Sequence, residues 1–88
     1  MINVALFGLG RIGQMHGENL YTHKKFNLKY TFDIDKNLSK KISNRFNAIS
    51  IDNPKSAFQD KNIDVVFIAS STPTHINLIN EATKYKKV

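Results

Sequence analysis

The chain has 88 residues, a length that allows one folded domain and leaves no room for a second within it. Hydrophobic residues make up 41% of the chain, which excludes an intrinsically disordered sequence, and the absence of cysteine excludes a disulfide framework or a thiolate metal site. The formal net charge of +6 comes mainly from lysines expected at helix ends and in loops, so it predicts a solvated surface and no nucleic-acid partner.

Residues 2–7 form an apolar run that ends at a glycine. The run is too short to span a membrane and has no basic residues before it, so we expect neither a membrane segment nor a targeting peptide, and we expect a cytoplasmic protein. Both faces of the run are apolar, which predicts the central strand of a parallel sheet with helices on each side.

A glycine-rich turn follows this strand, because residues 8–13 read Gly-Leu-Gly-Arg-Ile-Gly. A G-x-G-x-x-G turn between a strand and a helix binds a dinucleotide, and each glycine has a separate role. Gly8 allows the tight turn, Gly10 lets the backbone approach a pyrophosphate, and Gly13 lets the helix pack close to the strand. The first N–H groups of the helix have no partner within it and point toward the anion.

The next elements place an acid where the dinucleotide motif requires one. Residues 11–24 predict a helix in which Gly17 lowers helix propensity, a cost that a tight packing contact would explain. Residues 27–33 predict a second strand, less buried than the first, that ends at Asp33, 20 residues after Gly13. A carboxylate there accepts hydrogen bonds from the adenosine ribose and repels a 2′-phosphate, so it favours NAD, with NADP as the alternative.

Helices and strands alternate through the rest of the chain. We expect a helix over residues 37–46 capped by Asp35 or Asn37, a short strand over 48–51, a helix from Pro54 to about Asp60 with Asn53 as its cap, a strand over 63–69, a helix to about Tyr85 and the start of a fifth strand at 86–88. This order predicts an α/β fold, a doubly wound parallel sheet of the Rossmann type with strand order 3-2-1-4 and a fifth strand only begun.

Hydroxyl side chains follow the fourth predicted strand, at the edge where ligands of such sheets bind. Ser70, Ser71 and Thr72 are therefore expected to line the nicotinamide-ribose side of the cofactor, and Thr72 also to cap the next helix. The histidines do not have metal-ligand spacing, so we predict no metal site and expect His16 to pack within the fold.

Two segments and the acid at Asp33 together resemble the Gfo/Idh/MocA oxidoreductases. The segments are V-A-L-F-G-L-G-R-I-G-Q-M-H at 4–16 and D-V-V-F-I-A-S-S-T-P-T-H at 64–75, and the first is most similar to inositol 2-dehydrogenase-like members. The resemblance covers the whole chain and implies a nicotinamide-binding Rossmann domain followed by a larger α+β substrate domain. It also implies a position near the cofactor for His75, which we interpret as a neutral packing or hydrogen-bonding group.

The resemblance carries over cofactor-binding positions and no catalytic ones. In the family the fifth strand leads into Glu-Lys-Pro with a catalytic lysine, and the catalytic Asp and His belong to the second domain. We therefore expect residues 1–88 to be an incomplete NAD(P)-binding domain of a homo-oligomeric enzyme that oxidises a sugar or cyclitol hydroxyl by hydride transfer. The predicted cofactor-binding residues are Gly8, Leu9, Gly10, Arg11, Ile12, Gly13, Asp33, Ile34, Ser70, Ser71, Thr72 and His75.

Two other functions stay open on the sequence alone. A non-enzymatic NAD(H)-sensing Rossmann regulatory domain would share the glycine turn and Asp33, but it would not lead into Glu-Lys-Pro. A nucleic-acid-binding module is suggested only by the net charge, and it would show an affinity that falls steeply with salt.

Overall fold

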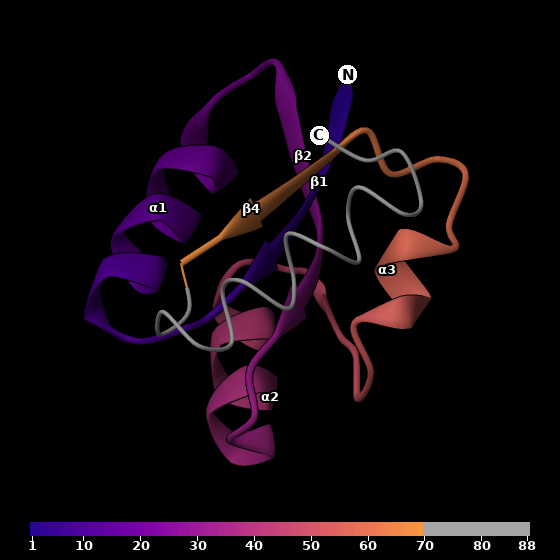
Figure 1. The fold of residues 1–88 in the computed structure, drawn as a ribbon. Coiled ribbons are helices and arrows are strands. Elements are labelled where there is room, and N and C mark those ends of the chain that lie inside the picture. Colours follow the sequence, from indigo (N-terminus) through magenta and orange to yellow (C-terminus); the bar gives the residue numbers. More distant parts are fainter. Residues whose placement is uncertain (70–88) are drawn as a thin grey trace.

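Four parallel strands in the order β3-β2-β1-β4 form the centre of the protein (Figure 1). The computed structural model describes residues 1–69. This arrangement confirms the predicted Rossmann-type sheet, whereas the predicted fourth helix and fifth strand lie outside the described residues. In chain order the elements are β1 (Ile2–Phe7), α1 (Arg11–Thr22), β2 (Phe26–Phe32), α2 (Lys36–Arg45), β3 (Ile49–Ser50), α3 (Lys55–Phe58) and β4 (Val65–Ile68).

The central strand β1 is buried on both faces, because α1 and α2 cover one side of the sheet and α3 covers the other (Figure 1). Residues 4–7 are completely shielded from solvent, as the apolar run predicted. Successive side chains of β1 point to opposite faces of the sheet and belong to two separate apolar clusters. The cluster beneath α3 contains Ala5, Phe7, Ile51, Ala57, Phe58, Ile63 and Val66, and the cluster beneath α1 and α2 contains Leu6, Leu9, Leu28, Ile42 and Phe46.

A bulge at Lys29 interrupts β2. Val4 pairs with Leu28 but Ala5 pairs with Tyr30, so Lys29 is an extra residue in the ladder. A one-residue shift moves the following side chains to the other face, so Tyr30 packs into the cluster beneath α3 while Leu28 packs beneath α1 and α2. β2 is less buried than β1, as the alternation along residues 27–33 indicated.

The observed helix ends lie within a residue or two of the predicted ends, which is the usual uncertainty of such boundaries. Asp35 is the N-cap of α2 and accepts a hydrogen bond from the Leu38 N–H at 3.1 Å. The helix α3 begins one residue later than predicted, with Pro54 rather than Asn53 at the cap position. The Asn53 side chain still accepts a hydrogen bond from the first helical N–H, that of Lys55, at 2.9 Å.

Two residues of α1 pack against the sheet as the sequence indicated. A Cβ atom added at Gly17 would lie 2.6 Å from Cε2 of Phe46 and 3.1 Å from Cδ2 of Leu6, so only glycine allows this close approach. The His16 ring lies 4.6 Å from the Phe67 ring, centroid to centroid, which confirms that His16 packs within the fold.

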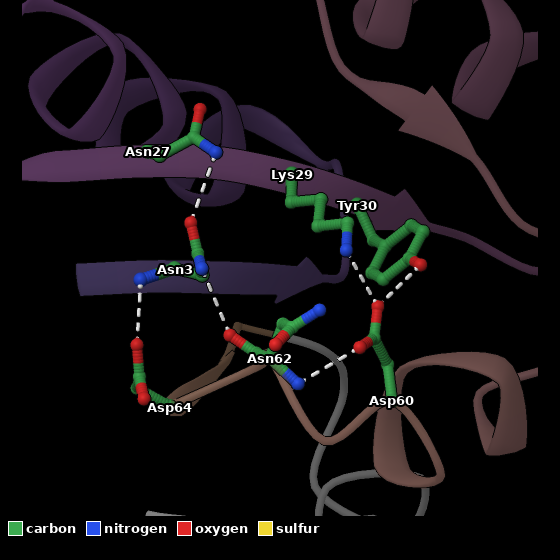
Figure 2. A network of polar contacts seen from close by, with 7 residues as sticks. All are labelled: Asn3, Asn27, Lys29, Tyr30, Asp60, Asn62 and Asp64. Atoms are coloured by element: carbon green, nitrogen blue, oxygen red, sulfur yellow. Dashed lines mark hydrogen bonds and ion pairs between the residues drawn. The ribbon is translucent and has the colours of Figure 1, made fainter. Parts of the chain in front are cut away.

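A polar network centred on Asp60 links β2 to the loop that leads into β4 (Figure 2). One carboxylate oxygen accepts hydrogen bonds from Lys29 Nζ at 2.7 Å and from the Tyr30 hydroxyl at 2.6 Å, and the other accepts the Asn62 N–H at 2.9 Å. The bulge lets these neighbouring residues reach the same partner. The bonds from Lys29, then Tyr30, then Asn62 hold the pKa of Asp60 well below its usual value.

Replacing Asp60 by asparagine is expected to lower the free energy of unfolding by roughly 1–3 kcal/mol at neutral pH, because charge-assisted hydrogen bonds are lost. Since the folded-state pKa of Asp60 is lowered, its contribution is fully present above the unfolded-state pKa of about 4 and decreases as the pH falls from there through the folded-state pKa. Urea unfolding should therefore show the same gap between wild type and variant at pH 7 and 5 and a narrower gap at pH 3. The exposed Asp52→Asn is the matched control, and a gap that does not depend on pH would contradict this account.

Candidate functional site

The turn between β1 and α1 requires glycine at its first position. Gly8 has a φ of 92°, in the left-handed region that side chains disfavour. Its N–H donates a hydrogen bond to the Phe32 carbonyl at 2.9 Å, so the turn begins while the chain is still attached to β2. The loop therefore starts at the carboxyl ends of two neighbouring parallel strands, the edge at which ligands of such sheets bind.

Gly13 is required for packing. A Cβ atom there would overlap the carbonyl oxygen of Gly8 and lie 2.8 Å from its carbonyl carbon. It would also lie 3.7 Å from Cβ of Ala69, just after β4. The obstructing atoms nearest to it belong to backbone, which cannot rotate away, so only glycine brings α1 this close to the loop.

Neither backbone conformation nor packing requires the glycine at position 10. Gly10 is the N-cap of α1 with φ −67° and ψ −171°, an extended conformation open to any residue. Among residues 1–69, no atom would lie within 4 Å of a Cβ added there. The helix has no side-chain cap and no acid in its first turn, in contrast to α2 with its Asp35 cap. The positive end of the α1 dipole thus faces an open space that suits an anion.

The Asp33 side chain contacts this loop at Leu9, a residue 24 positions earlier in the sequence. One of its carboxylate oxygens accepts the Leu9 N–H at 2.7 Å, and the other accepts the Asp35 N–H at 2.9 Å. An ionised carboxylate has about four acceptor positions, so capacity remains for a ligand hydroxyl. The Leu9 side chain is completely buried in the cluster beneath α1 and α2, so Leu9 can meet a ligand only through its backbone.

Gln14, which the sequence did not single out, contacts the loop from the first turn of α1. Its Nε2 donates a hydrogen bond to the Leu9 carbonyl at 3.1 Å, and its backbone N–H donates to the Gly10 carbonyl at 2.8 Å. The glycine pattern leaves this position unspecified, so the pattern itself carried no signal for it. A side chain with an N–H donor in the first turn of the helix is the only hint that the sequence contains.

Exposed side chains border the open space at Gly10. Arg11 and Ile12 begin α1, and Ile12 is 62% exposed. Ile34 follows Asp33 and is 79% exposed. Isolated exposed apolar residues are common, but these two adjoin the loop and the acid that the dinucleotide motif specifies. Together they offer apolar surface next to the backbone N–H groups at the start of α1.

The structure thus brings together eight of the twelve predicted site residues, the glycine turn with Asp33 and Ile34. The other four, Ser70, Ser71, Thr72 and His75, lie outside the described residues. Ala69, the last described residue, donates its N–H to the Phe7 carbonyl at 2.7 Å and lies beside Gly13. Residues 1–69 contain no group of three or more metal-ligating side chains and no helix long and apolar enough to cross a membrane.

Comparisons with known proteins agree with this geometry. The family profile described as an oxidoreductase family with an NAD-binding Rossmann fold, GFO_IDH_MocA, matches residues 2–88. A myo-inositol 2-dehydrogenase of Thermotoga maritima is 30% identical over 87 residues, and an uncharacterized oxidoreductase, YrbE, of Bacillus subtilis is 32% identical over 88; each match covers 98% of the chain.

A solved structure with bound ligands also matches. The myo-inositol dehydrogenase of Lactobacillus casei, in complex with NAD(H) and myo-inositol, superimposes with a TM-score of 0.91 at 26% identity, over 99% of the chain and 26% of that protein. The chain likewise spans only 26% of the length of the two curated relatives.

Proposed function

Because the chain belongs to the Gfo/Idh/MocA family of oxidoreductases, with its NAD-binding Rossmann fold, we propose that residues 1–88 form the part of the protein that holds the NAD cofactor. The observation that carries the proposal is the open space at Gly10. No atom of residues 1–69 comes within 4 Å of a Cβ there, so the packing of the described part of the chain gives no reason for a glycine. A pyrophosphate in contact with the backbone supplies that reason.

Each predicted residue has a role in this proposal. The glycine turn and the N–H groups of Arg11 and Ile12 bind the pyrophosphate, and Asp33 accepts hydrogen bonds from the adenosine ribose. Ile12 and Ile34 offer apolar contact to the rings of the cofactor. Leu9 shapes the loop through its backbone contacts with Asp33 and Gln14. Ser70, Ser71 and Thr72 stay assigned to the nicotinamide-ribose side, and His75 to a position near the cofactor as a neutral packing or hydrogen-bonding group.

We extend the proposal to the protein that contains this chain. The relatives include inositol dehydrogenases, one of them in complex with NAD(H) and myo-inositol, and this supports oxidation of a polyol or sugar hydroxyl. When bound, the nicotinamide supplies the hydride acceptor, and these residues orient it. We propose that the substrate-binding and catalytic groups belong to a domain other than this one, and that the enzyme is cytoplasmic and homo-oligomeric.

Calorimetric titration of the chain with NAD and NADP tests the cofactor assignment. We expect NAD to bind more tightly than NADP, because the Asp33 carboxylate repels a 2′-phosphate. Asp33→Ala should lower the NAD affinity about tenfold, or roughly 1.4 kcal/mol, through lost ribose hydrogen bonds and a released Leu9 N–H.

Asp35→Ala is the matched control, since it removes a nearby negative charge that caps α2 and makes no contact with the loop in this proposal. It should lower stability by about 1 kcal/mol and leave the NAD affinity unchanged. If the wild-type chain binds neither cofactor, or if both variants weaken NAD equally, the proposed site is wrong.

A further inference from the structure

Leu9, between the first two glycines, is held from three directions. Its N–H is bound by Asp33 at 2.7 Å, its carbonyl by Gln14 Nε2 at 3.1 Å, and its side chain is completely buried. The acid and the buried side chain fix the position of the residue. The contact from Gln14 is different, because it acts on the peptide group that Leu9 shares with Gly10.

This contact determines where the Gly10 N–H points. The peptide group is planar and trans, so its C=O and N–H point in opposite directions. Gln14 holds the Leu9 carbonyl with its side chain and the Gly10 carbonyl with its backbone N–H. Two successive peptide groups are therefore anchored by one residue, and the N–H groups of Gly10 and Arg11 are turned away from Gln14, toward the uncapped end of α1.

We propose that Gln14 is a positioning residue for the cofactor pyrophosphate, acting by fixing the peptide group between Leu9 and Gly10. This inference rests on the proposed function. Donors that already point at the anion before binding lose less conformational entropy when it arrives, so the anchoring raises affinity without a contact between Gln14 and the ligand. Loss of this contact should therefore lower the affinity only for ligands that carry the pyrophosphate.

The test compares Gln14→Met, which keeps the length of the side chain but has no N–H donor, with the wild-type chain. NAD, ADP-ribose and adenosine are titrated against both by NMR. We expect Gln14→Met to weaken NAD and ADP-ribose about fivefold and to leave adenosine unchanged, because the adenosine ribose is bound by Asp33. The ¹⁵N–¹H signal of Gly10 should shift in the ligand-free variant, since its peptide group is no longer held.

Gln59→Met, at an exposed position at the end of α3, is the matched control and should change neither affinity nor the Gly10 signal. Unchanged NAD affinity in Gln14→Met overturns the inference, and so does an equal loss for all three ligands, which would indicate a general loosening of the domain. Failure of the wild-type chain to bind NAD overturns the proposed function itself and this inference with it.

Discussion

Replacing Gly13 by alanine is expected to destabilise the chain more than any other single methyl group added within residues 1–69. The new Cβ would overlap the Gly8 carbonyl oxygen and lie 2.8 Å from its carbon. Gly8 cannot retreat, because its N–H is bound to Phe32 and it follows directly on the fully buried end of β1. The helix α1 would have to move instead and would lose contact with Leu6 and Phe46 at Gly17.

The expected cost is about 3 kcal/mol or more, at the upper end for overpacking, because the obstructing atoms are backbone. For a domain of this size such a loss lowers the melting temperature by roughly 12 °C or more. Thermal unfolding followed by circular dichroism measures it. Gly10→Ala is the matched control, since the same methyl group there meets no atom of the described residues within 4 Å and should change stability by less than about 1 kcal/mol. Similar melting temperatures for the two variants would contradict this explanation.

The sequence was informative about the glycine turn because its requirements are local. The turn at Gly8 and the close packing at Gly13 follow from three glycines at fixed spacing after an apolar run, and the structure has both. The same is true of the sheet order, because short connections between alternating strands and helices leave few topologies. The place of Asp33 beside the loop was predictable too, because the carboxyl ends of neighbouring parallel strands lie at the same edge of the sheet.

The features that the sequence did not reveal depend on contacts between separate elements. The bulge at Lys29 is invisible in a pattern of alternating residues, because it follows from the pairing of β2 with β1 and from the Asp60 contacts. The role of Gln14 depends on a side chain that reaches back to Leu9, a position that the glycine motif leaves open. Such contacts are set by three-dimensional arrangement, so propensity and spacing carry no signal for them.

Replacing Gly10 by alanine is expected to weaken NAD binding at least 50-fold, equivalent to about 2.4 kcal/mol, while the fold stays intact. The backbone at Gly10 is extended and accepts an alanine without strain. The added methyl would occupy the space through which a pyrophosphate reaches the N–H groups at the start of α1, so it would hold the anion away from its donors. Calorimetry with NAD, on samples whose melting temperature matches wild type, measures the effect.

Adenosine separates this steric effect from a general loss of the site. It carries no phosphate, so its contact with Asp33 should survive in Gly10→Ala and its affinity should stay within about twofold of wild type. Loss of both ligands would mean that the methyl group disturbs the Leu9–Asp33 contact as well. Full retention of NAD affinity would mean that the pyrophosphate does not pass Gly10. The main reason for assigning a cofactor to this turn would then be gone. The pair Gly10→Ala and Gly13→Ala thus separates binding from folding within a single motif, with the same added methyl group in each.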